Sequence, residues 1–166
     1  MKKLSIVLII LLHLSFSCKT TKILNEEKVK VQELGYGICS TKTVKIDDLS
    51  TSPTGQHLSG EKKLNIIKKT DTISIDDGVQ FGIEYIITSP KTEIIPIKTI
   101  WIYPDGLKDN HGQPIKKTEY FVRKKTNEYT YSNYTLGPRA EMVTGDWVLE
   151  LYFDDKQILR KIFHLK

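Results

Sequence analysis

The segment that decides the fold is the C-terminal stretch 147-WVLELYFDDKQILRKIFHL-165, in which two apolar runs flank a short acidic break. Apolar side chains occupy every second position of the first run, at Trp147, Leu149, Leu151 and Phe153. Because successive side chains of a strand point to opposite faces, this run predicts a half-buried strand with Trp147 in the core. Asp154-Asp155-Lys156 has the residues of a tight turn, and 158–165 is predicted to return as the second strand of a hairpin.

The same pattern of strands and turns continues upstream. The run 79–88 alternates like the C-terminal strand, and further strands are predicted at 29–33, 64–69, 94–103, 119–123 and 129–134. Turn residues separate them, as at Asp77-Gly78 and Gly137-Pro138. About seven or eight short strands with no amphipathic helix predict an all-β protein, an antiparallel immunoglobulin-like β-sandwich. A small β-barrel is the alternative.

Two stretches break the regular pattern. Gly35-Tyr36-Gly37 interrupts the first strand and predicts a bulge or a bend. Residues 40–60 are rich in Ser, Thr, Gly and Pro, and Ser52-Pro53-Thr54-Gly55 is a turn signal. We therefore expect a long loop or an irregular edge over 40–60, and loops of that length in compact domains are usually functional or mobile.

The N-terminus has the features of a bacterial export signal. Lys2 and Lys3 precede an apolar run over 4–14, which is too short to span a bilayer, and Cys18 follows the small residue Ser17. Residues 14–18 resemble a loose version of the lipobox, in which the cysteine is acylated. We predict a lipoprotein signal peptide at 1–17, a lipidated tether at 18–28 and one domain at 29–166. An ordinary secretory signal, leaving Cys18 as a thiol, is the alternative.

A lipid at Cys18 would place the protein in the cell envelope. Residue 19 is lysine and not the aspartate that resembles an inner-membrane retention signal, which favours the outer membrane. The segment 19–22 has no acidic pair of the kind linked with surface export, which favours the periplasmic side. The membrane is therefore the first expected partner.

The net charge and the number of cysteines bear on two further questions, whether the protein binds nucleic acid and whether it forms a disulfide. The formal net charge of +5 falls to +3 without Lys2 and Lys3, and this small excess is spread along the chain, which argues against a nucleic-acid partner. The chain has two cysteines, and if Cys18 is acylated Cys39 has no partner for a disulfide. Cys39 follows Leu34, Tyr36 and Ile38 and is expected to be a small buried hydrophobe.

Motifs for catalysis, metals and cofactors are not found in the sequence. His57, His111 and His164 are far apart and outside any zinc-binding pattern, and no nucleophile elbow or phosphate-binding loop occurs. One loop contains several side-chain oxygens that could bind calcium, those of Asp105, Asp109 and Asn110. Their spacing fits a turn better than a calcium-binding loop. We therefore predict no catalytic residue, no cofactor and no metal site, although a triad of distant residues stays possible.

One surface combines aromatic rings with cations, which suits the binding of a peptide or a sugar. The candidate binding residues are Tyr120, Arg123, Tyr129, Tyr131, Tyr134 and Arg139. Phe121, Lys124 and Lys125 lie between them in the sequence. The structural alternative is a hairpin whose tyrosines cover the edge of the core and whose turn is 123–125.

Several stretches together resemble an exported bacterial family, domain of unknown function 3859. They are GYG at 35–37, GVQFG at 78–82, YPDGL at 103–107, Gln113-Pro114 and VTGDW at 143–147. The likeness covers nearly the whole chain after the signal peptide. This family has no assigned activity, so the resemblance implies no catalytic residues.

Three hypotheses for function follow. The first is a non-catalytic, membrane-anchored envelope domain that binds an unknown protein, peptide or glycan through loops at one end of the sandwich. The second is a structural subunit of an envelope complex, recognised by a sheet edge or an apolar patch. The third and least favoured is a hydrolase of envelope polymers, with a site assembled only in the fold. A pocket that holds a histidine beside an acid would favour the hydrolase.

Overall fold

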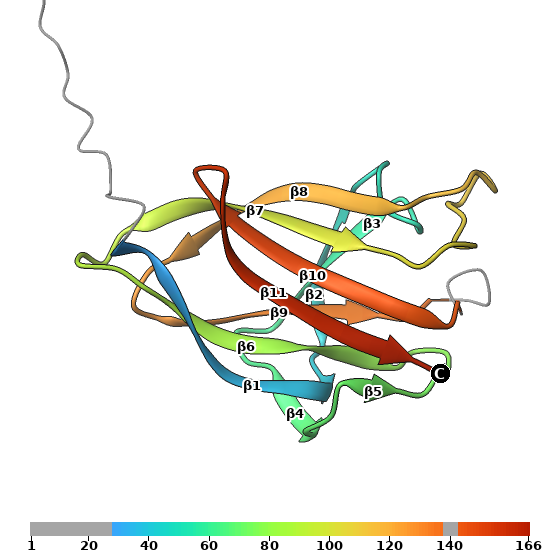
Figure 1. Ribbon diagram of the computed structural model, residues 1–166, viewed down its shortest axis with the longest axis horizontal. Coiled ribbons are helices and arrows are strands. Elements are labelled where there is room, and N and C mark those ends of the chain that lie inside the picture. The colour runs from blue at the N-terminus through green and yellow to red at the C-terminus, as the bar shows by residue number, and fades with distance from the viewer. Residues whose placement is uncertain (1–27, 138–142) are drawn as a thin grey trace, which may run out of the picture.

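The computed structural model describes residues 28–137 and 143–166, and the regular structure in these residues is almost entirely β (Figure 1). The strands are β1 (Lys30–Ser40), β2 (Thr43–Asp48), β3 (Gln56–Gly60), β4 (Asn65–Lys68), β5 (Thr72–Ile73), β6 (Gln80–Thr88), β7 (Ile94–Ile102), β8 (Lys117–Lys125), β9 (Tyr129–Thr135), β10 (Gly145–Phe153) and β11 (Lys156–Leu165). Within the described residues, no helix has the length and apolar character needed to cross a membrane.

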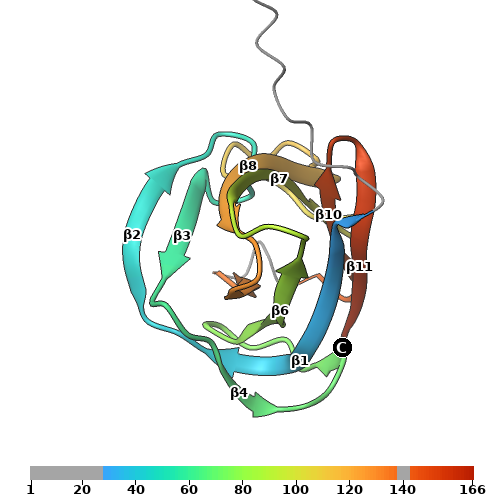
Figure 2. The same ribbon diagram turned by 90° about the vertical axis from the view of Figure 1, so that its left-hand side faces the viewer.

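The strands form two open sheets that pack face to face. One sheet has the order β4-β1-β6-β9 and the other β5-β11-β10-β7-β8, while β2 and β3 make a separate two-stranded sheet. The pairs within the two large sheets are antiparallel except β11 with β5. Figure 2 shows the layers end on, with β2 and β3 on the side opposite β10 and β11. The predicted immunoglobulin-like sandwich is therefore confirmed.

The core lies between the sheets, where the alternating positions of β6 and β10 meet. Phe81, Ile83, Tyr85 and Ile87 of β6 are fully buried, as are Trp147, Leu149 and Leu151 of β10. The Phe81 ring meets the Trp147 ring edge to face, with a centroid distance of 6.1 Å. Trp147 thus occupies the core position that its place in the sequence predicts.

The predicted C-terminal hairpin is also present. Phe153 pairs with Lys156, which leaves Asp154 and Asp155 as the two loop residues. Their φ angles are 45° and 62°, in the left-handed region that a type I′ turn requires at both positions. Aspartate tolerates this conformation better than most residues, so the acidic break determines the turn.

The glycine-rich break in β1 is a bulge, as predicted. The register with β6 shifts between Glu33 and Gly35, and Gly37 has a φ of 138°. A Cβ atom at Gly37 would lie 2.0 Å from the carbonyl oxygen of Lys68 on β4. Only glycine therefore allows β1 and β4 to approach this closely.

Residues 40–60 differ from the predicted long loop, because most of them form the hairpin β2–β3. The hairpin was missed because its apolar side chains face outward: Val44 is 64% exposed and Ile46 is 59% exposed. The Thr118 hydroxyl donates to the carbonyl of Thr51 at 2.9 Å and thereby ties the hairpin tip to β8. The hairpin thus crosses the side of the sandwich that β8 and β9 border (Figure 2).

The predicted hairpin of residues 119–134 is wrong. β8 is the last strand of one sheet and β9 the last strand of the other, so the chain crosses between layers at 126–128. Residues 123–125 belong to β8 and do not form the turn. Thr126 is buried, and its hydroxyl donates to the carbonyl of Lys91 at 2.8 Å. This hydrogen bond holds the crossover segment 126–128 against the connection between β6 and β7.

Candidate functional site

A cleft of about 500 Å³ opens where the two sheets part at β8 and β9. Its walls are residues 120–124 of β8, residues 129–133 of β9, and the hairpin with its exit segment at 57–62. β8 and β9 are both terminal strands of their sheets, so among the described residues this side is covered by the hairpin β2–β3 and not by a strand that pairs with either of them. The volume is in the range of sites that bind small molecules or short chain segments.

A second cavity of about 150 Å³ continues the cleft toward the hairpin tip. The two cavities share four lining residues, which are His57, Leu58, Tyr120 and Asn133. Trp101, Tyr103 and Tyr134 line the inner part of the second cavity. The two cavities therefore form one groove along the open side, polar near β9 and aromatic toward the core.

Thr99 of β7 lies at the bottom of the cleft. It is 1% exposed, and it pairs with Tyr120 on β8 and with Leu151 on β10. Two buried side-chain oxygens in the described residues have no hydrogen-bond partner, those of Thr41 and Thr99. An unpaired buried hydroxyl costs about 1–3 kcal/mol. The Thr99 oxygen is shielded from solvent, so it lies beneath the floor of the cleft and is not on its accessible surface.

Lys124 of β8 reaches across the cleft to β9. Its Nζ donates a hydrogen bond of 2.9 Å to the carbonyl oxygen of Tyr131. Burial lowers the pKa of Lys124 to about 8. No carboxylate in the described part of the chain lies within ion-pair distance of this amine. Lys124 is therefore a partly buried cation that keeps donors for another partner.

His57 of β3 faces Lys124 from the hairpin. Its ring lies 4.6 Å from the ring of Tyr120, measured between centroids. Burial lowers the pKa of His57, and the nearby cations Lys124 and Lys45 lower it further, while Asp47 raises it. The imidazole is thus held neutral near pH 7, where it can donate one hydrogen bond and accept another.

The candidate residues taken from the sequence surround the cleft but do not share one face. Tyr120 points inward and lines both cavities, whereas Tyr134 lines only the second one and packs against the core, with a centroid distance of 4.8 Å to Trp147. Arg123 is exposed at the rim. Arg139 lies outside the described residues, so its place in this surface stays a prediction.

Tyr129 and Tyr131 have a structural role at the edge of the cleft. The Tyr129 hydroxyl accepts from the Leu64 amide at 3.0 Å and bonds Glu84 Oε2 at 3.0 Å. The Tyr131 hydroxyl donates to the carbonyl of Glu61. Both tyrosines therefore hold the segment 61–64, which carries the chain from the hairpin to β4.

Sequence reasoning did not select His57 or Thr99 for this surface. His57 was one of three isolated histidines in a predicted loop, and no pattern linked it to β8. Thr99 occupies an inward position of a strand, where an apolar residue is expected. A polar threonine between the inward residues Ile97 and Trp101 was therefore the signal in the sequence that could have drawn attention to it.

The other sites considered from sequence have local explanations. Asp109 Oδ1 accepts from the amides of His111 at 2.9 Å and Gln113 at 2.8 Å, which is the geometry of an aspartate turn. No three histidine, cysteine, aspartate or glutamate side chains of the described residues are grouped so as to hold a metal ion. Cys39 is 3% exposed and burial raises its pKa to about 12, so it is the predicted small hydrophobe.

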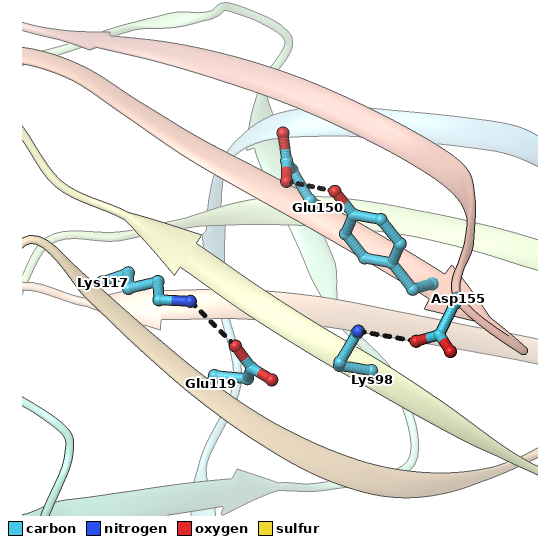
Figure 3. A network of polar contacts seen from close by, with 6 residues as sticks. Lys98, Lys117, Glu119, Glu150 and Asp155 are labelled. Atoms are coloured by element: carbon cyan, nitrogen blue, oxygen red, sulfur yellow. Dashed lines mark hydrogen bonds and ion pairs between the residues drawn. The ribbon is translucent and has the colours of Figure 1, made fainter.

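The outer face of the β5-β11-β10-β7-β8 sheet contrasts with the cleft because its charges are paired. Figure 3 shows Lys98 Nζ with Asp155 Oδ1 at 3.1 Å and Lys117 Nζ with Glu119 Oε2 at 3.1 Å. Glu150 accepts from the Tyr152 hydroxyl at 2.8 Å on the same face. These contacts are those of an ordinary solvated sheet surface, whereas the Lys124 amine in the cleft has no acidic partner among the described residues.

The fold and the cleft define an immunoglobulin-like sandwich with an open lateral groove. A solved immunoglobulin-like protein from Pseudomonas aeruginosa is similar with a TM-score of 0.60 and 18% identity, over 86% of this chain and 99% of that chain. The model of the family described as Domain of unknown function (DUF3859) matches residues 27–165. The chain belongs to this family, which confirms the resemblance seen in the sequence.

The other comparisons add no functional information. A β-glucosidase from Listeria innocua matches with a TM-score of 0.36 and 8% identity, over 78% of this chain and 16% of that enzyme. A β-glucosidase from Erythrobacter marinus matches with a TM-score of 0.35 and 12% identity, over 83% of this chain and 16% of that enzyme. Comparison with curated proteins gives no match.

Proposed function

We propose that this protein is a non-catalytic binding domain of the cell envelope, anchored by a lipid on Cys18, that holds a protein, peptide or glycan in the cleft between β8 and β9. The carrying observation is that the amine of Lys124 lines the cleft, has no acidic partner among the described residues and uses one of its three donors. A ligand in the cleft can supply the missing partner.

The arrangement of the chain ends suits an anchored domain. β1 begins beside the end of β6, where Lys30 pairs with Thr88, and the loop 103–116 lies toward the opposite end (Figure 1). Thr51 in the hairpin tip is bound to Thr118 beside that loop. A tether over 18–28 would therefore leave the loop end directed away from the membrane, with the cleft along the side. Lys19 favours the outer membrane, and the absence of an acidic pair at 19–22 favours its periplasmic side.

Two other functions are each supported by one observation. A structural subunit is supported by the outer face of the hairpin, where Val44 and Ile46 are 64% and 59% exposed. A hydrolase is supported by His57 and Asp47, which line the same cleft. The binding function is preferred because it uses the amine of Lys124, which neither alternative requires.

Titration with small probes, followed by amide NMR of the full-length protein, tests the proposed function. The probes are acetate, N-acetylglucosamine and a capped dipeptide. At least one should shift the amide signals of Thr99, Lys124 and Ser132 progressively, because these residues line the cleft. Shifts confined to the loop 103–116, or no shifts with any probe, would argue against a binding cleft. Product signals that disappear in His57→Asn would instead establish a hydrolase.

A further inference from the structure

We propose that the ligand of this cleft is an acidic peptide in extended conformation, which pairs with the free edge of β9 and places a carboxylate on Lys124. The inference rests on the proposed function and specifies the chemistry of its ligand. It follows from two features of the cleft, the direction of the β9 backbone and the charge of the groups around it.

The first feature is the edge of β9. In an antiparallel strand, alternate residues direct both backbone groups to the same side. The carbonyl of Tyr131 accepts from Lys124, so it points away from β6 and into the cleft. Tyr129 and Asn133 are two residues to either side and direct their backbone groups the same way. β9 is the terminal strand of its sheet, so this row of groups can accept an added strand, provided that the Lys124 amine moves from the Tyr131 carbonyl to the carboxylate of the strand.

The second feature is the charge around the cleft. Lys62, Arg123 and Lys124 are its cationic lining residues, and Asp47 and Glu61 are its acidic ones. Asp47 is already paired, because Lys45 Nζ lies 2.6 Å from its Oδ1. Lys124 has no such partner in the described part of the chain, and its amine lies beside the β9 edge. A carboxylate on the bound strand would supply the missing counter-ion.

The hydrogen-bonding groups favour a peptide over a sugar. A peptide strand offers an amide and a carbonyl at every second residue, which matches the spacing of Tyr129, Tyr131 and Asn133 along β9. The aromatic rings of the adjoining cavity are mostly buried, as with Trp101 at 2% exposure, so they offer little surface for stacking on a sugar ring.

Calorimetry with two matched peptides tests the inference on the full-length protein. The acidic probe is a capped octapeptide of four Thr-Asp repeats, and the neutral control has four Thr-Asn repeats. The acidic peptide should bind about tenfold more tightly or better, because a charge-assisted bond to Lys124 is lost with asparagine. Hydrogen exchange should slow at the amides of residues 129, 131 and 133, which point away from β6, because added-strand hydrogen bonds protect them.

Substitutions at Lys124, compared with one at its neighbour Lys125, test whether Lys124 is the cation that binds the carboxylate of the peptide. Lys124→Gln should remove most of the preference for the acidic peptide, and Lys124→Arg should retain it. Lys125→Gln is the matched control, because Lys125 is the next residue, is exposed, and already pairs with Glu128. Its affinity should stay within about twofold of the wild type. The comparison of the two peptides on the wild-type protein does not depend on how well a variant folds.

Equal affinity for the two peptides would overturn the role of the carboxylate. Tight binding of the acidic peptide without protection of 129–133 would overturn strand addition. Failure of both peptides, with cleft amides still shifted by acetate or N-acetylglucosamine, would reject the peptide but keep the binding cleft. Failure of the peptides and of all small probes would reject both proposals together.

Discussion

Replacing Trp147 with alanine is expected to lower the free energy of unfolding by about 3–5 kcal/mol. The side chain is fully buried, and its ring meets Tyr103 and Tyr134 with centroid distances of 4.9 Å and 4.8 Å. Its indole nitrogen donates to the carbonyl of Val143 at 3.1 Å. Truncation would leave a cavity between the sheets and remove this hydrogen bond. Equilibrium denaturation in urea measures the effect.

The control for Trp147 is an aromatic residue on the outside of the same sheet. Phe121 is 70% exposed, so Phe121→Ala should change the free energy of unfolding by less than about 0.5 kcal/mol. An effect of Trp147→Ala below about 1 kcal/mol would contradict the register of β10, because a shift by one residue turns the side chain outward.

Replacing Cys18 with serine is expected to abolish membrane attachment. Cys18 lies outside the described residues, and this prediction depends on the sequence of the export signal alone. Two or three acyl chains each bury many methylene groups at about 0.8 kcal/mol apiece, so lipidation makes anchoring effectively permanent. The wild-type protein should pellet with membranes and enter the detergent phase, whereas Cys18→Ser should be soluble or remain uncleaved.

Cys39→Ser is the matched control for the anchor. Cys39 is buried in the sandwich, so its replacement should leave the partitioning unchanged even if it lowers stability. A mature wild-type protein that stays soluble after cell fractionation, with a free thiol at Cys18, would establish an ordinary secretory signal instead.

Strands that cross the core were predictable because burial on one face leaves a period of two in the sequence. β6 and β10 have this period, and the turn residues Asp154 and Asp155 determined the final hairpin. β2 and β3 could not be found in this way. Their inner face borders a polar cleft and their apolar residues Val44 and Ile46 face outward, so their pattern does not distinguish a strand from a loop.

The location of the candidate site was partly predictable. The alternation of aromatic and cationic residues over 119–134 led to both walls of the cleft. The short connection at 126–128 also suits a hairpin, however, and only the pairing of β9 with β6 separates the two strands into different sheets. His57 and Thr99 reach the cleft through contacts between distant segments, which local patterns do not encode.

Photo-crosslinking in intact cells tests most directly whether the cleft holds a ligand. A benzophenone amino acid is placed at Lys62, an exposed residue on the rim of the cleft, or at Lys156, an exposed residue beside the β10–β11 turn. Both changes remove one positive charge, so the pair is matched. We expect a discrete adduct from position 62 and none from position 156. Adducts from 156 alone, or none at 62 when the protein is fully anchored and folded, would contradict a ligand in the cleft.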